Sequence, residues 1–316
     1  MEYTHCMGKT GIKPKHFLTI NDITPNELLE LLDSAIDLKT RGWIAPLKQK
    51  MMALVFEKPS LRTRVSFEVA MRQLGGQSLY LSPEEVGLGK RESVPDVARV
   101  LSRFVDIIVL RTFAQKNLEV LAEFSSVPVI NALSDYEHPC QALADLLTIY
   151  EIKGKLKWLT VAYVGDGNNV ANSLMQACAM TGVNFHIASP KGYTIDPAVL
   201  KKAQTYAKTS GSKIMVTEDP RAAAKDVDVL YTDTWTSMGQ ETEAAVRRKA
   251  FADYQINEKL VALAKRNVII MHCLPAHHGE EVSVGLLDSP QSVVFDQAEN
   301  RMHAQKALLA WIFAKK

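Results

Sequence analysis

The stretch MMALVFEKPSLRTRVSFEVAMRQLGG, residues 51–76, contains one complete strand–loop–helix unit. Residues 51–57 form a short apolar run and predict a buried strand. Residues 63–74 carry apolar side chains at helical spacing, and the two glycines that follow are typical of a helix C-terminus. A strand followed at once by a helix is the repeating unit of α/β proteins.

The same alternation continues along the rest of the chain. Strands that alternate with helices predict parallel sheets covered by helices on both faces. The polar residues 150–158 mark the expected domain boundary, so we expect an α/β fold with two doubly wound parallel-sheet domains, residues 1–150 and 151–297. The expected strands are 105–112, 127–133, 159–165, 184–190, 213–217, 227–234 and 267–273, and the expected helices are 140–152, 169–180, 197–208, 257–265 and 298–314.

Composition excludes several classes of protein. The chain has 316 residues, 47% of them hydrophobic and 23% charged, with a formal net charge of +2. These values are ordinary for a soluble globular protein and argue against a nucleic-acid-binding surface. No apolar stretch approaches the roughly 20 residues that a membrane span needs. We therefore expect neither a nucleic-acid partner nor a membrane.

The N-terminus and the cysteines indicate the compartment. The first fifteen residues, MEYTHCMGKTGIKPK, lack the apolar core of a signal peptide and predict a loose tail. Cys6, Cys140, Cys178 and Cys273 lie far apart, with no pair in CxxC spacing. They are typical of reduced thiols rather than of a disulfide framework or a zinc site. The sequence predicts a cytoplasmic protein.

The first functional signal lies where the strand over 51–57 ends. Pro59 ends the strand, and Ser60 stands where a helix N-cap belongs. The first helical turn carries Arg62, Thr63 and Arg64. Cations oppose the helix dipole at this end, whereas a bound anion is stabilised by the free N–H groups. Two solvated surface arginines are the alternative. The added hydroxyl groups make an anion site the better interpretation.

Three further strand ends carry polar groups, at the edge where parallel sheets bind ligands. Arg111 ends one strand, His138 precedes a helix with Gln141 in its first turn, and Cys273 ends the last expected strand. Each has an ordinary alternative: a surface arginine, a turn, or a thiol in the core. Histidine can also donate to a carbonyl group or move a proton, and cysteine can act as a nucleophile beside a base.

Two kinds of cofactor site fit the sequence poorly. His272, His277 and His278 surround a Leu-Pro pair at spacings that suit no metal, and no second cluster supports them. YVGDGNNVANS, residues 163–173, partly matches the dinucleotide fingerprint G-x-G-x-x-G, but Val170 replaces the third glycine. The next expected strand also ends without an acidic residue for a ribose. We expect no cofactor and no metal.

SLRTR, HPCQALADLLT, DTWTSMG and HCLP, in this order, resemble the aspartate/ornithine carbamoyltransferase family. The resemblance extends from about residue 16 to 314; SMG at 237–239 and HCLP at 272–275 are similar to the ornithine branch. It implies cofactor-free transfer of the carbamoyl group of carbamoyl phosphate to the side-chain amine of L-ornithine, giving L-citrulline and phosphate. It also implies that residues 1–150 bind carbamoyl phosphate, that 151–297 bind ornithine, and that the C-terminal helix, about 298–316, packs back on the first domain.

The resemblance also implies roles for individual residues. Arg111, His138 and Cys273 are expected to be catalytic. The expected ornithine contacts are Asn169, Asp233, Ser237 and Met238. The expected carbamoyl phosphate contacts are Ser60, Leu61, Arg62, Thr63, Arg111, His138, Gln141, Cys273, Leu274 and Arg301.

The family's usual homotrimer, or a multiple of it, is a further expectation from the resemblance. One position departs from the family pattern: Gly87 stands where a loop glutamine often reaches a neighbouring subunit's site. The basic pair Lys90 and Arg91 remains and can take over that contact.

Other functions remain as alternatives. A nicotinamide dehydrogenase lacks its fingerprint here, and a non-catalytic relative would not need the full set of candidate residues. A sister enzyme could use another amine: aspartate, putrescine or an acylated ornithine. Aspartate would call for cations in place of Asp233, and putrescine, which has no carboxylate, would not need Asn169. Ornithine fits best.

Overall fold

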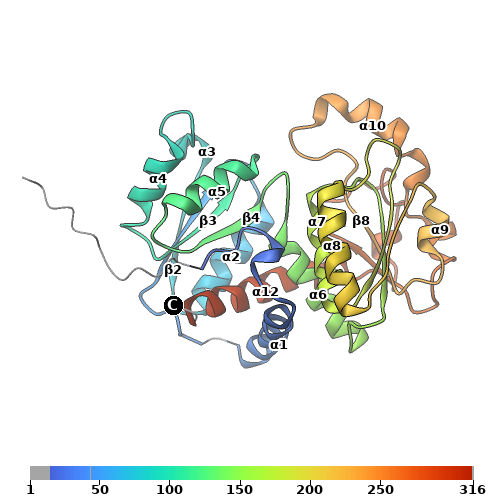
Figure 1. Cartoon of the computed structure of the whole chain (residues 1–316), viewed down its shortest axis with the longest axis horizontal. Helices are drawn as coiled ribbons and strands as arrows, with labels where there is room; N and C mark the ends of the chain where they lie inside the picture. The colour runs from blue at the N-terminus through green and yellow to red at the C-terminus, as the bar shows by residue number, and fades with distance from the viewer. Residues whose placement is uncertain (1–14, 43, 315–316) are drawn as a thin grey trace, which may run out of the picture.

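The computed structural model describes residues 15–42 and 44–314, and they form two parallel sheets side by side (Figure 1). The predicted α/β fold with two parallel-sheet domains is confirmed. In the first sheet, β1 (Met51–Phe56), β2 (Gln77–Leu81), β3 (Ile107–Arg111) and β4 (Val129–Leu133) lie in the order β2-β1-β3-β4. In the second, β5 (Thr160–Val164), β6 (Asn184–Ala188), β7 (Ile214–Thr217), β8 (Val229–Thr232) and β9 (Ile269–His272) lie in the order β7-β6-β5-β8-β9.

Helices cover both faces of each sheet, as strand β1 illustrates. Successive side chains of a strand point to opposite faces. Met52 and Leu54 join the core shared with α1, α2, α6 and α12, whereas Ala53 and Val55 join the core beneath α4 and α5. The helices are α1 (Pro25–Arg41), α2 (Leu61–Gln73), α3 (Pro83–Val86), α4 (Val94–Leu101), α5 (Gln115–Phe124), α6 (Pro139–Lys153), α7 (Asn169–Thr181), α8 (Pro197–Ser210), α9 (Pro220–Ala224), α10 (Ala244–Ala250), α11 (Glu258–Val261) and α12 (Val294–Ala314).

The element bounds agree with the sequence patterns with a few differences. The helix expected over 257–265 is only the short α11, because turns replace it after Val261. The last helix starts at Val294, earlier than the expected 298. Helices α1, α3, α4, α5, α9 and α10 and strand β2 are additional to the expected set. No helix in the described part of the chain is long and apolar enough to cross a membrane.

Both sheets reverse their strand order at one point, and these points position the site. The chain moves outward from β1 to β2 and then returns to the other side of β1 with β3. It likewise moves from β5 through β6 to β7 and returns beside β5 with β8. Ligands bind at such switch points, beyond the carboxyl ends of the strands. The loops after β1 and β3 therefore form one candidate binding edge, and those after β5 and β8 form the other.

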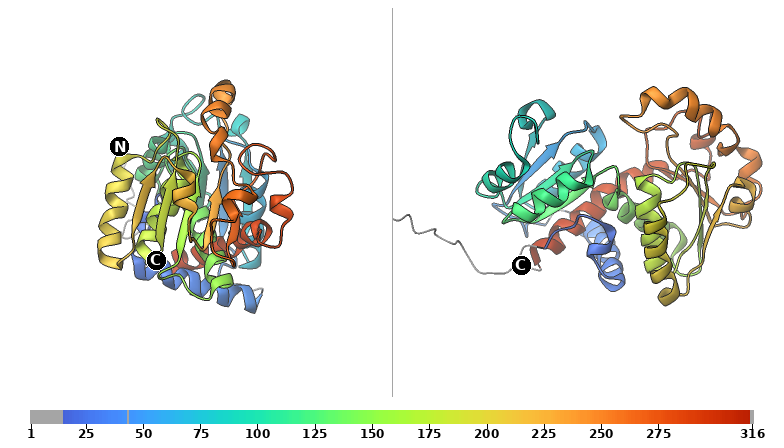
Figure 2. Two further views of the ribbon diagram at one scale, coloured as in Figure 1. Left: turned by 90° about the vertical axis from the view of Figure 1, so that its right-hand side faces the viewer. Right: turned by 45° about the horizontal axis from the view of Figure 1, so that its top comes forward.

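Helices α6 and α12 lie between the two sheets (Figures 1 and 2). Eleven of the fifteen residues of α6 are buried, because the helix packs against both lobes. Helix α12 packs on α1, α2 and α6, which confirms the prediction that the C-terminal helix returns to the first domain. Its buried Lys306 donates to the carbonyl oxygen of Leu38 at 2.9 Å and to Oε1 of Gln73 at 3.0 Å.

Packing of α12 is expected to contribute strongly to stability. Leu308 is fully buried, whereas Phe295 on the same helix is 72% exposed. Leu308→Ala should lower the free energy of unfolding by about 2–5 kcal/mol, because it leaves a cavity between the helices. Phe295→Ala should change it by less than about 0.5 kcal/mol. Urea unfolding of both variants tests this, and equal losses would contradict the position of α12.

Candidate active site

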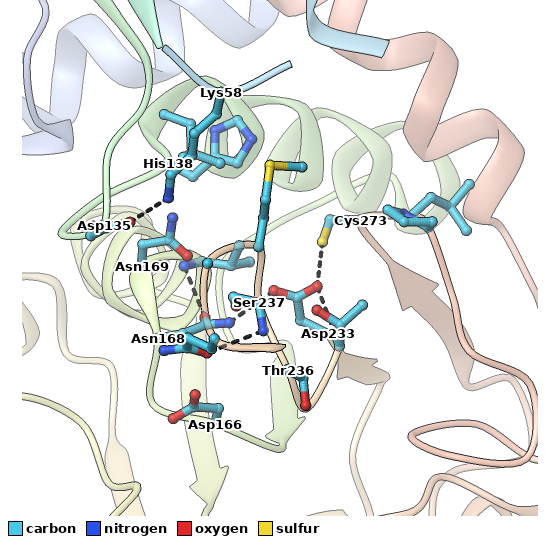
Figure 3. Close-up of a pocket in the computed structure, with 18 of the residues that line it drawn as sticks. Lys58, Asp135, His138, Asp166, Asn168, Asn169, Asp233, Thr236, Ser237 and Cys273 are labelled. Carbon is cyan, nitrogen blue, oxygen red and sulfur yellow. Dashed lines mark hydrogen bonds and ion pairs between the residues drawn. The ribbon is translucent and has the colours of Figure 1, made fainter. Parts of the chain in front are cut away.

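A cleft of about 1100 Å³ opens at the carboxyl ends of the strands of both sheets (Figure 3). It is lined by the loops that follow β1, β3 and β4 on one side and β5, β8 and β9 on the other. Every candidate site residue from the sequence lines it, with the exceptions of Arg64 and Gln141. The residues brought together are Ser60, Leu61, Arg62, Thr63, Arg111, His138, Asn169, Asp233, Ser237, Met238, Cys273, Leu274 and Arg301.

The N-terminus of α2 faces this cleft. Ser60 is the N-cap, and its hydroxyl oxygen accepts from the backbone N–H of Thr63 at 3.3 Å. The Thr63 hydroxyl oxygen accepts from Nη2 of Arg301, on α12, at 2.7 Å. Free backbone N–H groups, two hydroxyl groups and a cation therefore meet at one point. This is the chemistry that binds phosphate or carboxylate.

The prediction that both arginines of this turn flank an anion is wrong for Arg64. Only Arg62 lines the cleft. Arg64 points away, with Nε donating to Glu68 at 3.0 Å and its guanidinium 3.9 Å from the ring centroid of Tyr80. Arg62 and Arg64 are at positions i and i+2 of the helix. Side chains at this spacing point about 200° apart, so they cannot share a face.

Arg62, Arg111 and Arg301 bring three positive charges to the same side of the cleft. Burial, followed by the Arg301 and Arg62 cations, lowers the pKa of Arg111 to about 10, so it stays charged at neutral pH. The Nε groups of Arg111 and Arg301 are buried and make no hydrogen bond with the described residues. Unpaired buried donors beside mutually repelling cations favour an anionic ligand.

His138 is the N-cap of α6 and lies in the cleft wall. Burial, together with Arg301 and Arg111, holds its pKa well below the usual value, so the imidazole is neutral at physiological pH. Its Nδ1 is buried and makes no hydrogen bond with the described part of the chain. A neutral imidazole can donate to, or accept from, a bound group without adding a fourth charge.

Gln141 lies behind the cleft wall rather than in it. Its Oε1 accepts from Nη1 of Arg301 at 2.9 Å, and its Nε2 donates to Asp145 at 2.9 Å. The Asp145 carboxylate also accepts from Tyr231 at 3.2 Å and Gln297 at 2.7 Å. Gln141 thus orients Arg301, and its contact with a carbamoyl nitrogen stays a prediction.

On the other side of the cleft, Asp233 follows β8 at the switch point of the second sheet. Its Oδ2 accepts from Nδ2 of Asn168 at 2.8 Å, and its Oδ1 lies 2.9 Å from Sγ of Cys273 (Figure 3). Burial and the Asp233 charge raise the pKa of Cys273 well above its usual value. Cys273 is therefore a neutral thiol that donates to the carboxylate.

The neighbouring loops complete this side. Asn169 begins α7, and its Nδ2 donates to the backbone oxygen of Ser134 at 2.6 Å. Ser237 and Met238 lie on a turn between β8 and α10, and Met238 is 46% exposed. Arg247 of α10 anchors this segment by donating to Asp166 at 2.7 Å and to the backbone oxygen of Trp235 at 3.0 Å.

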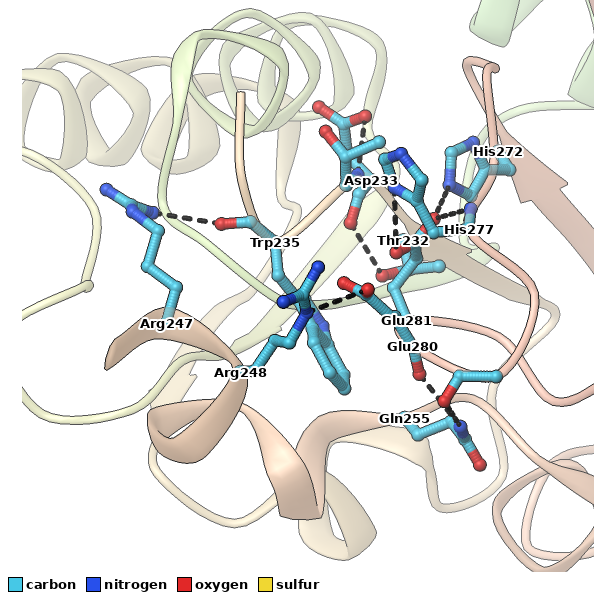
Figure 4. A network of polar contacts seen from close by, with 12 residues as sticks. Thr232, Asp233, Trp235, Arg247, Arg248, Gln255, His272, His277, Glu280 and Glu281 are labelled. Atoms are coloured by element: carbon cyan, nitrogen blue, oxygen red, sulfur yellow. Dashed lines mark hydrogen bonds and ion pairs between the residues drawn. The ribbon is translucent and has the colours of Figure 1, made fainter. Parts of the chain in front are cut away.

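The HCLP stretch is held by a buried histidine. Nδ1 of His272 accepts from the backbone N–H of Leu274 at 2.8 Å, and its Nε2 lies 3.1 Å from Oε1 of Glu281 (Figure 4). Leu274 has a φ of 56°, a left-handed conformation that costs roughly 1–2 kcal/mol for a residue with a side chain. The bond to His272 stabilises this conformation and so fixes Cys273 and Leu274 at the cleft.

Two groups of side chains have ligand atoms close enough for a metal ion. Asp233, His272 and Cys273 form one, and His277, Glu280 and Glu281 form the other. Both ring nitrogens of His272 already have partners, so it offers no free lone pair. Glu280 accepts from Nε of Arg248 at 2.9 Å (Figure 4).

Several cleft residues were not predicted. Lys58 is almost fully buried, forms an ion pair with Asp135 at 2.5 Å, and has its Nζ 4.2 Å from the ring centroid of Phe113. Its only signal in the sequence is its place directly after a strand. Asn168 was not predicted either, although it stands next to Asn169 after the same strand. Its side chain donates to Asp233.

Comparisons with known proteins agree with this geometry. Two family models match the chain: aspartate/ornithine carbamoyltransferase, carbamoyl-P binding domain, over residues 15–151, and the Asp/Orn binding domain over residues 157–312. An ornithine carbamoyltransferase of Anoxybacillus flavithermus is 53% identical, over 94% of this chain and 96% of that protein. One of Bacillus subtilis is 51% identical, over 98% of each.

Solved structures give the same result. An ornithine carbamoyltransferase from Pyrococcus furiosus has a TM-score of 0.91 and 50% identity, covering 96% of this chain and 98% of that one. A structure of acetylornithine transcarbamylase complexed with acetylcitrulline has a TM-score of 0.87 at 32% identity, covering 94% of this chain and 99% of that one. With both family models matched in order and a solved relative 50% identical over 96% of this chain, this chain belongs to the aspartate/ornithine carbamoyltransferase family.

Proposed function

We propose that this chain is an ornithine carbamoyltransferase, which transfers the carbamoyl group of carbamoyl phosphate to the side-chain amine of L-ornithine and releases L-citrulline and phosphate. The observation that carries the proposal is the meeting of Arg62, Arg111 and Arg301 at the N-terminus of α2. The buried Nε groups of Arg111 and Arg301, which have no partner among the described residues, suit a dianionic phosphate together with the Arg62 cation. The choice of amine is supported by relatives about half identical to the chain that carry this name.

In this proposal the first domain binds carbamoyl phosphate. Ser60, Leu61, Arg62 and Thr63 hold the phosphate through the N-terminus of α2, and Arg301 reaches it from α12. Arg111 bridges the phosphate and the carbonyl oxygen. His138 completes the contacts to the carbonyl group, Gln141 serves the carbamoyl nitrogen, and the backbone of Leu274 lies beside it.

The chemical step needs donors and cations rather than a covalent intermediate. The ornithine amine attacks the carbamoyl carbon, a C–N bond forms, and negative charge develops on the carbonyl oxygen. Arg111, neutral His138 and the Thr63 hydroxyl stabilise that oxygen. The C–O bond to phosphate then breaks, the phosphate leaves among the arginines, and the proton of the attacking amine passes to an oxygen of the departing phosphate. Cys273 stays a thiol throughout and helps to orient Asp233.

The second domain binds ornithine. Its α-amino group pairs with the Asp233 carboxylate, and its carboxylate accepts from Asn169. Ser237 and Met238 close over the substrate from the turn between β8 and α10. The exposure of Met238 supports this role, because a half-exposed apolar side chain at a cleft mouth is free to cover a ligand.

The oligomer and the compartment are parts of the same proposal. We infer a cytoplasmic homotrimer, or a multiple of it, from family membership. Gly87, Lys90 and Arg91 follow α3 and do not line the cleft of their own chain. Lys90 and Arg91 would therefore reach a phosphate only in a neighbouring copy.

The identity of the amine can be tested directly. Carbamoyl phosphate is offered with ornithine, putrescine, N-acetylornithine or aspartate in separate reactions, and the ureido product is measured. Citrulline from ornithine should form fastest by a wide margin. A better rate with another amine would retain the carbamoyl phosphate site and overturn the ornithine assignment. No product from any amine would favour a non-catalytic relative.

The two arginines of α2 provide a matched pair. Arg62→Ala should lower kcat/KM for carbamoyl phosphate about 100- to 1000-fold, the usual effect of removing a donor from a charge-stabilising site. Arg64→Ala should lower it only slightly, because Arg64 contacts Glu68 and Tyr80 outside the cleft. Steady-state kinetics compare them, and near-normal turnover of the Arg62 variant would contradict the phosphate site.

The pH profile should follow the amine. A side-chain ammonium has a pKa of about 10.4, so the free amine increases about tenfold per pH unit between pH 6 and 8. His138 does not oppose this rise, because its lowered pKa keeps it neutral throughout the window. The value of kcat/KM for ornithine should therefore climb steadily with pH. A flat profile would count against attack by the free amine.

A further inference from the structure

Glu137 is a fully buried carboxyl that the proposed reaction does not use. It precedes His138 in the loop between β4 and α6. Its Oε2 accepts from the backbone N–H of Ile20 at 2.9 Å and from the Ser173 hydroxyl at 2.9 Å. Its Oε1 accepts from Nε2 of Gln176 at 3.2 Å. Burial raises the pKa of Glu137 to about 7.

Ser173 joins this carboxyl to His138. Its hydroxyl oxygen accepts from the backbone N–H of His138 at 2.9 Å and donates its own proton to Glu137. The Ser173 oxygen accepts from the His138 N–H, so its hydroxyl proton is directed at Oε2 of Glu137, which accepts it. The backbone nitrogen of His138 is adjacent to its Cα, so this bond also governs where the imidazole points.

The loop containing His138 is bound to α7, on the second domain, along a regular stripe. Asn172 donates to the backbone oxygen of Tyr136 at 2.9 Å, and Asn169 donates to that of Ser134. With Ser173 and Gln176, these residues occupy positions i, i+3, i+4 and i+7 of one helix face. The position of His138, in the first lobe, is thus set by a helix of the second lobe.

We propose that Glu137 is a positioning residue for His138, acting through the Ser173 hydroxyl, which it orients between the two domains. The inference rests on the proposed function, because it takes His138 as the group that contacts the carbonyl of carbamoyl phosphate. Gln176 supplies the structural comparison. It donates to the same carboxyl from the same helix, but no hydrogen bond joins it to His138 among the described residues.

The test compares single variants of α7 and Glu137 in the full-length protein. Ser173→Ala and Glu137→Ala should each lower kcat by about 10- to 100-fold, the range expected when a catalytic group is displaced. The double variant should be no slower than either single one, because both changes break one connection. Glu137→Gln should recover most of the lost turnover, since its amide oxygen still accepts from Ser173.

Gln176→Ala is the control that separates positioning from stability. It should lower the midpoint of urea unfolding at least as much as Ser173→Ala while kcat stays near the wild-type value. Equal kcat losses in both variants, or additive losses in the double variant, would show that Glu137 only braces the fold and would overturn the proposal.

A second measurement separates this inference from the proposed function. Calorimetric binding of carbamoyl phosphate is measured for the wild type and for the Ser173→Ala, Glu137→Ala and Gln176→Ala variants. Weaker binding in the Ser173→Ala and Glu137→Ala variants, but not in Gln176→Ala, would support positioning of His138 even if the wild type made no citrulline. Equal binding in all four, with wild-type citrulline formation intact and kcat unchanged, would reject the positioning role and retain the enzyme.

Discussion

The guanidinium of Arg301 is the contact on which the site depends. It is fully buried, comes from the last helix, and donates to Thr63 at the start of α2 and to Gln141 at the start of α6. Pairing of these two donors lowers the cost of burying the cation, so α12 must dock between these two helices for the first domain to be complete. The end of the chain is thereby tied to two strand ends that occur much earlier in the sequence. The docked Arg301 also adds its positive charge to the cleft.

The doubly wound topology explains why two sets of substrate groups face each other. The order in which the chain adds strands reverses once in each sheet. Each reversal leaves a gap between neighbouring loops at the carboxyl ends of the strands. In the first sheet the gap collects cations and N–H groups, and in the second it collects Asp233 and the amides of Asn168 and Asn169. The wall formed by the first sheet therefore suits an anion, and the wall formed by the second sheet suits an amine. His138 stands between them because its loop belongs to one sheet while its backbone N–H is held by α7 of the other.

Local patterns were sufficient for the fold and for most of the cleft. The unit over 51–76 and the apolar strands predicted the parallel sheets. The residues at strand ends lie together in the cleft because parallel strands end at one edge of a sheet. The errors come from geometry that spacing alone does not carry. Arg64 was grouped with Arg62 although a helix turns it away. Spacing also does not show that Gln141 lies behind the cleft wall, where its oxygen accepts from Arg301; its carbamoyl contact stays a prediction. Lys58 and the Glu137–Ser173 pair depend on contacts between distant segments, which no local motif records.

Helix α6 has a consequence for how far the molecule can be divided. Because it is buried against both sheets, its surface lacks the polar face with which a helix at the edge of a lobe would meet water. Either lobe produced alone would expose apolar surface meant for the other, and an exposed patch of that kind promotes aggregation. The two lobes look separable in outline, yet they share one uninterrupted core. The chain is therefore poorly suited to being cut into halves.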